Sequence, residues 1–373
     1  MKHFTKFVKN EFPTVGVEQE FHIIDAKTGN LLPCVDDIIK ALDDDLRNSV
    51  TYELYLAVLE YKSSVCHTID ELAKEITQSR RRLADVCENI GAKLVASGSH
   101  PFADWRKVPI VNTQHYKWVI EQCMYIARRM LSFGLHVHVG MQNEQSAMYA
   151  LYEMRQWIYP LLAMSANSPY FEGQYTGLAS TRTHIFGSMP RTGLPPFFSD
   201  ITEMESFYHK LVAAGDITRP GDLWWIIRPQ PPLGTVELRV FDLPTDVRRL
   251  SAFAAITQAA LAFYQDRYLQ GIPLSNPKTE YLEQNRWKAM RFGLDCDIIE
   301  PVTGEIISMR SRLERLFDMI TPKADELKSL EHLNFAREML NLGNEAQWQL
   351  KTCKSLNGDL QALEFEIAKQ TLA

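Results

Sequence analysis

Apolar and polar residues alternate in three short segments of the chain, and this alternation predicts three strands. In residues 14–24, side chains such as Val15 and Val17 point to one side of an extended chain. Residues 135–139 and 235–241 show the same two-residue period. The opposite side of the predicted strands carries ionisable side chains, namely Glu18, Glu20, His136, His138, Glu237 and Arg239.

Helical periodicity accounts for most of the remaining chain. Thr68-Ile-Asp-Glu71 is a capping box, and the apolar residues after it recur at helical spacing until Gly91. A second apolar run, at 146–167, predicts one long helix with a kink at Pro160. Further helices are predicted at 116–130, 202–214, 247–269, 280–292, 309–320 and 359–373, and further strands at 93–99 and 223–228.

These elements predict a single α+β domain over residues 1–373, in which residues 246–373 are mostly helical. Strands with one polar face are typical of antiparallel sheets, because parallel strands are usually buried on both faces. We therefore expect a mainly antiparallel sheet with helices on one face and an active site on the other. Residues 168–199 are rich in glycine and proline and are predicted to be mostly loop. A loop of this length inside a compact domain is usually functional or disordered.

Composition excludes two classes of partner. The chain has 40 Lys and Arg against 46 Asp and Glu, a net charge of −6, so a basic nucleic-acid-binding surface is not expected. No uncharged stretch reaches the roughly 20 residues that a membrane span needs, and we expect a cytoplasmic protein. The six cysteines form no CxxC pair and are expected to be free, packed thiols.

The ionisable faces predict a metal site if they converge. Two like charges ~4 Å apart repel by about 4 kcal/mol at an effective dielectric of 20, so a carboxylate cluster needs cations or bound protons. Oxygen ligands with one imidazole suit Mg²⁺ or Mn²⁺, and an arginine on the same face suits phosphate. The pattern therefore favours divalent ions that hold a nucleoside triphosphate. The chain has no GxxxxGK[ST], GxGxxG, HExxH or GxSxG motif that would point to another host fold.

Two further acids, Glu53 and Glu60, are ambiguous from spacing alone. Residues seven apart lie on opposite faces of an unbroken strand, so these two can meet only through a bulge, a bend or a stretch of helix. Otherwise they are surface acids.

Three other groups of residues also have two readings. His22 and His100 are expected to be hydrogen-bonded histidines near the site rather than metal ligands. The pair Trp224–Trp225 is expected to fill the core, with adenine stacking as the alternative.

Several sequence blocks, in order along the chain, resemble the bacterial carboxylate–amine ligases of the type 2 glutamate–cysteine ligase family. The four principal blocks are Gly16-Val-Glu-Gln-Glu20, Phe133-Gly-Leu-His-Val-His-Val-Gly140, Ser180-Thr-Arg182 with Met189-Pro-Arg-Thr-Gly193, and Gly234-Thr-Val-Glu-Leu-Arg-Val-Phe-Asp242. Ser97-Gly-Ser-His-Pro101 and Trp225-Ile-Ile-Arg-Pro229 also match. The wider superfamily, which includes glutamine synthetase, implies a curved antiparallel sheet whose concave face binds ATP and magnesium ions.

The resemblance also implies roles for individual residues. His138 and Arg239 resemble the groups that contact the ATP phosphates, and Arg182 resembles the arginine that holds the substrate carboxylate or its acyl phosphate. Arg228 is a weaker candidate for that last role. Gln19 stands where relatives often have a third acid, and alternation predicts that it faces the helices. The residues that resemble metal ligands are Glu18, Glu20, Glu53, Glu60, His136 and Glu237.

The activity implied by the resemblance is an ATP-dependent C–N ligase, and specifically a glutamate–cysteine ligase. Its substrates would be small amino acids, its cofactors ATP with Mg²⁺ or Mn²⁺, and its assembly a homodimer. An acyl phosphate on a carboxylate would be attacked by an amine to form an amide. Two alternatives stay open at this point: a phosphotransferase of the same fold with a non-amine acceptor, and a catalytically inactive nucleotide-binding regulator.

Overall fold

The chain folds around a seven-stranded antiparallel sheet with the order β2-β3-β1-β5-β9-β8, to which β4 is added by pairing with β1. The computed structural model describes residues 7–10 and 12–372. The strands of this sheet are β1 (Val15–Asp25), β2 (Val50–Tyr52), β3 (Val58–Lys62), β4 (Ala92–Val95), β5 (Gly134–Gly140), β8 (Ile227–Gln230) and β9 (Thr235–Asp242). The predicted antiparallel α+β arrangement is confirmed.

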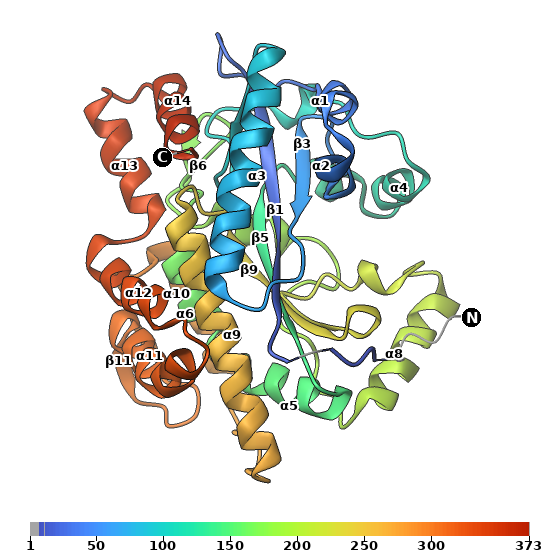
Figure 1. Cartoon of the computed structure of the whole chain (residues 1–373), viewed down its shortest axis with the longest axis vertical. Helices are drawn as coiled ribbons and strands as arrows, with labels where there is room; N and C mark the ends of the chain where they lie inside the picture. The colour runs from blue at the N-terminus through green and yellow to red at the C-terminus, as the bar shows by residue number, and fades with distance from the viewer. Residues whose placement is uncertain (1–6, 11, 373) are drawn as a thin grey trace.

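Long helices cover one face of the sheet (Figure 1). The helix α3 (Ile69–Asn89) begins at the Thr68 capping box and packs against α9 (Val247–Leu269) and β4. Arg80 of α3 is buried, and its Nε donates to Gln19 Oε1 at 2.9 Å. Gln19 therefore faces the helices, as alternation predicted.

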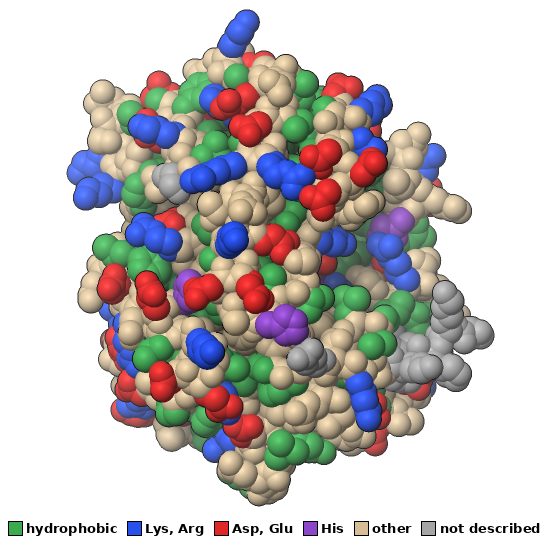
Figure 2. Space-filling view, in the orientation of Figure 1, with side chains coloured by type: hydrophobic (Ala, Val, Ile, Leu, Met, Phe, Trp, Pro, Cys, Tyr) green, Lys and Arg blue, Asp and Glu red, His purple; other side chains and the backbone are tan. Residues whose placement is uncertain are grey.

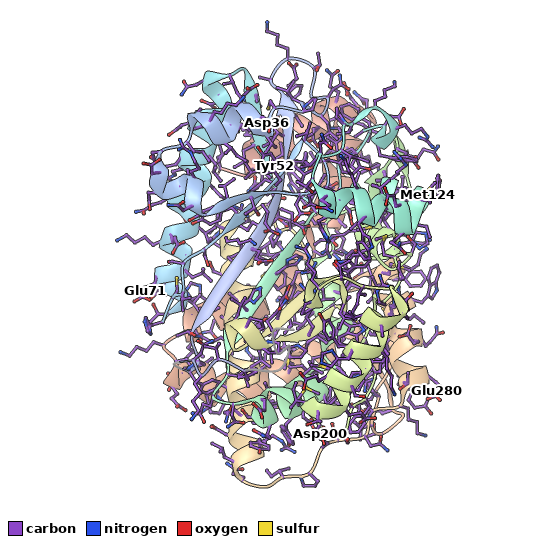
Figure 3. All side chains as sticks on the ribbon, turned by 90° about the vertical axis from the view of Figure 1, so that its right-hand side faces the viewer. Asp36, Tyr52, Glu71, Met124, Asp200 and Glu280 are labelled. Atoms are coloured by element: carbon purple, nitrogen blue, oxygen red, sulfur yellow. The ribbon has the colours of Figure 1, made fainter. Side chains whose placement is uncertain are left out.

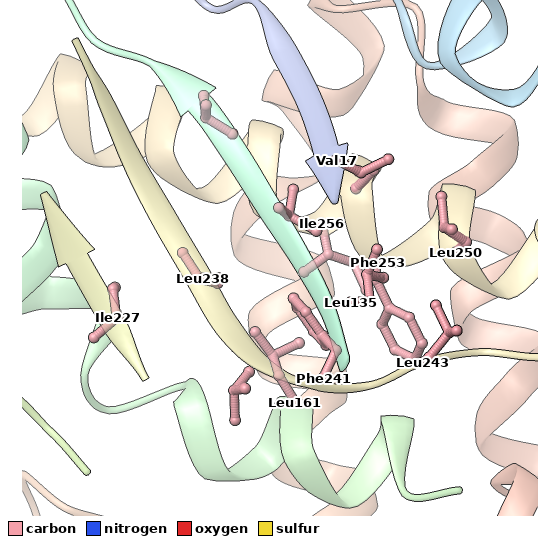
Figure 4. Packing of buried hydrophobic residues seen from close by; sticks show 14 of the residues in the cluster. Val17, Leu135, Leu161, Ile227, Leu238, Phe241, Leu243, Leu250, Phe253 and Ile256 are labelled. Atoms are coloured by element: carbon pink, nitrogen blue, oxygen red, sulfur yellow. The ribbon is translucent and has the colours of Figure 1, made fainter. Parts of the chain in front are cut away.

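The core lies between this face of the sheet and the helices α9 and α6 (Ile158–Ser165). Figure 4 shows Val17, Leu135 and Leu238 of the central strands opposite Phe253 and Ile256 of α9. All five side chains are buried. Because apolar residues fill one face of each strand, the ionisable residues of the same strands are directed to the other face.

The C-terminal part is helical, as predicted. It contains α10 (Thr279–Phe292), α11 (Met309–Glu326), α12 (Leu330–Leu342), α13 (Glu345–Ser355) and α14 (Leu360–Gln370). A small hairpin of β10 (Asp297–Ile299) and β11 (Ile306–Ser308) precedes α11. None of the described helices is long and apolar enough to cross a lipid bilayer. The six cysteines are free thiols, also as predicted.

Shorter helices lie elsewhere around the sheet. These are α1 (Val35–Ala41), α2 (Asp44–Asn48), α4 (Gln114–Arg128), α5 (Glu144–Met154), α7 (Thr181–Phe186) and α8 (Ile201–Ala214). The predicted loop at 168–199 holds α7 and a hairpin of β6 (Tyr170–Phe171) and β7 (Gln174–Tyr175), and is otherwise irregular.

Several predicted elements differ from the structure. The predicted helix at 146–167 is two helices, because the chain breaks between Met154 and Ile158 rather than at Pro160. Pro160 lies in the first turn of α6, where the missing N–H costs nothing. The strand predicted at 223–228 begins only at Ile227, and the strand predicted at 93–99 ends at Val95. The predicted last helix, 359–373, ends at Gln370, and residue 373 lies outside the described residues.

Candidate active site

Strand register brings the predicted site residues together on the open face of the sheet. Directly opposed residues of antiparallel neighbours share a face and have adjacent side chains. The opposed pairs are Glu18 with His136, Glu20 with Glu60, and His138 with Glu237. Four neighbouring strands, β3, β1, β5 and β9, therefore contribute ionisable side chains to one continuous surface.

Glu53 and Glu60 also converge, by a route that spacing alone left open. The two acids lie on either side of a chain reversal: Glu53 directly follows β2, and Glu60 lies on β3, which pairs with β2. Thr51 Oγ1, on the opposite strand, donates to Glu60 Oε1 at 3.0 Å. The segment that separates Glu53 from Glu60 thus contains a hairpin turn, and the interpretation of these two residues as surface acids is wrong.

A cavity of about 440 Å³ opens on this face. Figure 2 shows a recess at the right of the molecule, below α4 of Figure 1, with basic and histidine side chains at its edge. Figure 3 places α4, marked by Met124, beside the hairpin marked by Tyr52, and Tyr116 of α4 donates its hydroxyl hydrogen to Tyr52 O at 3.0 Å. Seven of the predicted site residues line the cavity, namely Glu18, Glu20, Glu53, Glu60, His136, Arg182 and Arg239.

His136 occupies the centre of the carboxylate cluster. Its Nδ1 lies 2.9 Å from Glu18 Oε2 and 3.8 Å from Glu237 Oε1, and its Nε2 lies 3.4 Å from Glu20 Oε1. The register shift between Leu135 and Val137 sets two residues of β9 against His136. This bulge brings Arg239 Nη1 to 3.3 Å from His136 Nδ1.

Glu237 and His138, the other two predicted site residues, lie directly behind the lining. Glu237 is fully buried and receives hydrogen bonds from Arg228 Nε at 2.7 Å, Arg239 Nη1 at 2.6 Å and Gln230 Nε2 at 2.6 Å. His138 Nε2 lies 3.8 Å from Glu18 Oε1 and 3.9 Å from Glu237 Oε1. Arg228 is thus an ion-pair partner of Glu237, which weakens its candidacy as the arginine that holds substrate.

Arg182 reaches the cavity from α7 across the backbone of Gly134. A Cβ atom on Gly134 would lie 2.1 Å from Arg182 Nη2, so only glycine leaves room for the guanidinium in this position. Arg182 Nη2 donates to the backbone oxygen of Arg239 at 3.2 Å, while Gly134 N donates to Glu20 Oε2 at 2.5 Å. The glycine therefore fixes both the arginine and one of the carboxylates.

Electrostatics divides the carboxylates into two groups. The charges of Arg228 and Arg239 outweigh burial and hold the pKa of Glu237 well below its usual value. Burial raises the pKa of Glu18, but the hydrogen bond with His136 and the nearby His138 outweigh it and lower this pKa to about 2.

The other group resists ionisation. Burial raises the pKa of Glu20 against the opposing charges of Arg182 and Arg239. Burial, followed by the negative charges of Glu60 and Glu20, raises the pKa of Glu53 well above its usual value. Acids that resist ionisation together are expected where a cation normally compensates them.

The donor set fits a hard divalent cation. Two groups of three side chains have ligand atoms within 4.8 Å of one another, Glu18 with His136 and Glu237, and Glu20 with Glu60 and His136. The Nε2 atom of His136 is buried and has no hydrogen-bond partner among the described residues. Buried polar atoms nearly always have a partner, so this orphaned nitrogen within 3.4 Å of a carboxylate marks room for a ligand.

Several cavity residues were missed by the sequence reasoning. Lys62 forms ion pairs with Glu60 at 2.9 Å and Glu18 at 3.7 Å. Its position two residues after Glu60 on the same strand would have predicted this. Residues brought in by α4 and by the segment before β8 gave no such signal; these are His115, Tyr116 and Arg219.

The ambiguous histidines and tryptophans are resolved by burial. His22 Nε2 contacts Glu364 Oε1 of α14 at 2.7 Å, and His100 Nε2 contacts Gly29 O at 2.9 Å, so both are hydrogen-bonded histidines, as predicted. The tryptophan pair is divided: Trp225 is in the main core, whereas Trp224 lines the cavity.

Comparison with known proteins agrees with this arrangement. A sequence model of glutamate–cysteine ligase family 2 (GCS2) matches residues 14–364. The glutamate–cysteine ligase of Haloferax volcanii is 34% identical over 319 residues, which are 85% of this chain and 88% of that relative.

Two solved structures share the fold. The glutamate–cysteine ligase of Francisella tularensis in complex with AMP has a TM-score of 0.72 at 12% identity, over 99% of this chain and 90% of that chain. A bifunctional glutathione synthetase from Pasteurella multocida has a TM-score of 0.69 at 11% identity, over 96% of this chain and 52% of that chain. At these identities the likeness is one of fold. The sequence matches decide the family, and the chain belongs to glutamate–cysteine ligase family 2.

Proposed function

We propose that this protein is an ATP-dependent carboxylate–amine ligase that joins glutamate to cysteine through an acyl phosphate. One observation carries the proposal: five carboxylates, two histidines and three arginines from separate strands and one helix gather at a single cavity. The chain's family and the AMP in a relative of the same fold support ATP as the phosphoryl donor. A single catalytic domain over residues 1–373 is also proposed, because one hydrophobic cluster includes residues from Val15 to Leu340.

The carboxylates would hold Mg²⁺, with Mn²⁺ as a substitute. Glu18, His136 and Glu237 would form one site, and Glu20 and Glu60 would form a second that shares His136. Glu53 would complete the second site from the hairpin turn. Bound at these groups, divalent ions neutralise charge on the phosphoryl oxygens and orient the triphosphate.

The arginines have separate roles in the proposed reaction. The γ-phosphoryl group of ATP moves to the side-chain carboxylate of glutamate, and the P–O bond to ADP breaks. Arg239 and His138 would contact the phosphate oxygens during this transfer. Arg182 would hold the substrate carboxylate and then its acyl phosphate. Guanidinium groups that stay charged at all working pH values suit both tasks.

The decisive experiment measures ADP release from purified protein with ATP, magnesium and glutamate, first alone and then with cysteine or hydroxylamine. We expect the release to depend on glutamate and to rise with either nucleophile, with γ-glutamylcysteine or glutamyl hydroxamate identified by mass spectrometry. Omitting glutamate is the matched control. Turnover without any hydroxamate would favour a phosphotransferase with another acceptor, and no turnover with bound nucleotide would favour an inactive regulator.

Two further properties are proposals of the same kind. The homodimer implied by the family resemblance predicts about twice the chain mass of 42.8 kDa in sedimentation equilibrium. The cytoplasmic location, which is favoured by the use of ATP, predicts co-fractionation with other cytoplasmic enzymes.

A further inference from the structure

A histidine and an aspartate that lie far apart in the sequence meet at the edge of the cavity. His115 lies in the first turn of α4, and Asp222 ends the 3₁₀ turn Pro220–Asp222 just before β8. The His115 Nε2 atom is 4.0 Å from Asp222 Oδ1. His115, Arg219 and Gly221 all line the cavity that holds the candidate metal ligands.

Asp222 is held in place by hydrogen bonds to one oxygen, and its other oxygen faces His115 and Arg219. Its side chain is fully buried. The Oδ2 atom accepts three hydrogen bonds, from Thr218 N at 2.8 Å, Thr218 Oγ1 at 2.9 Å and Arg219 N at 3.1 Å. The Oδ1 atom makes no hydrogen bond within the described part of the chain; its cationic neighbours are Arg219 Nε at 3.5 Å and, if protonated, His115 Nε2 at 4.0 Å. A buried carboxylate oxygen without a hydrogen bond is costly, so a closer approach of the His115 ring, or of the Arg219 side chain, would be favourable.

His115 has the properties of a base that faces substrate. Its side chain is 23% exposed and lines the cavity, and a neutral imidazole that carries its proton on Nε2, toward Asp222, has its lone pair on Nδ1. Burial and the charge of Arg219 lower the pKa of His115, against the opposing charge of Asp222. Tyr208 of α8 lies close enough to Asp222 for the carboxylate to add to the effect of burial in raising the tyrosine pKa. A neutral imidazole oriented by a carboxylate is the usual form of a general base.

We propose that His115 accepts a proton from the amine nucleophile in the second half-reaction, and that Asp222 is the positioning residue that orients its ring. This inference rests on the proposed ligase function. It assigns the amine to the side of the cavity formed by α4 and the segment before β8. It also supplies a step that the metal ligands and the arginines cannot perform, because carboxylates bound to cations and charged guanidinium groups are poor proton acceptors.

The protons and bonds of this step balance. An amino acid enters as an ammonium ion, which cannot attack a carbonyl carbon until it loses a proton. His115 Nδ1 takes that proton and later releases it to solvent. The free amine forms the C–N bond, the C–O bond of the acyl phosphate breaks, and the phosphate leaves with the electron pair. The second proton of the nitrogen goes to the departing phosphate, which leaves as hydrogen phosphate.

A pair of nucleophiles separates this role from a structural one. Cysteine is mostly protonated on nitrogen at neutral pH and needs a base, whereas hydroxylamine is mostly unprotonated and does not. His115→Gln retains a polar group beside Asp222 but cannot accept the proton. We expect the ratio of γ-glutamylcysteine formation to hydroxamate formation to fall by about 100-fold, the usual size of a general-base contribution. His209→Gln, which changes an exposed histidine of α8, is the matched control.

Raising the pH provides a second readout. The free-amine fraction of cysteine grows with pH. The difference in the rate of product formation between His115→Gln and wild type should therefore become smaller with cysteine as the pH rises, and stay constant with hydroxylamine. Asp222→Asn should move the ratio in the same direction by a smaller factor. Equal losses with both nucleophiles, or an unchanged ratio, would overturn the role of His115. A wild-type protein that forms neither product would overturn the proposed function itself.

Discussion

The substitution Glu53→Gln should have opposite effects on the metal-free and metal-bound protein. The Glu53 carboxyl lies beside Glu60 and Glu20, and burial together with these charges raises its pKa well above 4.5. Ionising Glu53 without a bound cation is therefore unfavourable. Glutamine has nearly the same shape and carries no charge, so it removes this cost while it also removes a ligand oxygen.

The size of the effect follows from proton linkage. The largest possible effect at pH 7 is that of a carboxyl that stays protonated in the folded chain and ionises in the unfolded chain with its usual pKa of 4.5. The free energy of unfolding then falls by about 1.36 kcal/mol for each pH unit between 4.5 and 7. The upper limit is thus about 3.4 kcal/mol. Because Glu53 lines an open cavity and retains some contact with solvent, we expect a gain of about 1–2 kcal/mol in the metal-free variant.

Urea unfolding in EDTA and in magnesium tests both effects, the gain in stability without metal and the weaker stabilisation by metal. In EDTA, Glu53→Gln should be more stable than wild type above pH 4.5, because stability from a raised carboxyl pKa is lost as the pH rises. Magnesium at 100 times its Kd should stabilise wild type by about 2.7 kcal/mol and the variant much less. Glu88→Gln, an exposed acid of α3, is the control and should behave as wild type.

Two results would refute this reasoning. A metal-free Glu53→Gln protein less stable than wild type would mean that the carboxylates do not repel one another. An undiminished response to magnesium would mean that Glu53 is not part of a cation site.

Two other changes test separate parts of the site, and a third tests Glu364 of α14, which does not line the cavity. Glu237→Gln should abolish ADP formation. It should also lower the free energy of unfolding by about 3–5 kcal/mol, because it leaves the buried Arg228 and Arg239 without their carboxylate. Near-normal activity would contradict the metal assignment. Gly134→Ala should displace Arg182 and lower ADP formation by about 100-fold while circular dichroism stays unchanged, and an active variant would show that this arginine is not needed where it lies. Burial raises the pKa of Glu364 to about 7, so wild type should lose about 3 kcal/mol of its free energy of unfolding between pH 4.5 and 7, and Glu364→Gln should not show this loss. Urea unfolding of both proteins at pH 5 and at pH 8 measures the effect. A difference between variant and wild type that is the same at both pH values would contradict it.

The sequence predicted the central strands and their polar face because one side of each strand is apolar, with Gln19 of β1 as an exception. In β1, Val15 and Val17 pack on the helices, so Glu18 and Glu20 must face the cavity. The boundaries of α3 were likewise predicted, because the Thr68 cap is a local signal.

The turn that brings Glu53 to Glu60 could not be predicted by the same reasoning. Residues 54–57 are Leu-Tyr-Leu-Ala, without the glycine, proline or asparagine that marks most hairpin turns. The break between α5 and α6 was missed for a similar reason, because residues 155–157 contain neither glycine nor proline. In both places tertiary packing, rather than local sequence, determines where the chain bends.

The pairing of His115 with Asp222 was invisible in the sequence because α4 and the 3₁₀ turn meet only in the folded chain. Neither residue belongs to a motif or an alternating strand. The position of Arg182 in the cavity also depends on the folded chain, because it requires the missing side chain of Gly134. Sequence resemblance identified that arginine, and the geometry explains why its neighbour is glycine.

The central claim is that these carboxylates and His136 bind divalent cations that carry ATP. Crystals grown with manganese and a non-hydrolysable ATP analogue, measured at a wavelength where manganese scatters anomalously, test it directly. We expect anomalous peaks roughly 2.0–2.3 Å from oxygens of Glu18 and Glu20 and from a nitrogen of His136, with the analogue's phosphates on the cavity side. Manganese and nucleotide bound elsewhere on the molecule, with Lys62 still paired with Glu60, would contradict it.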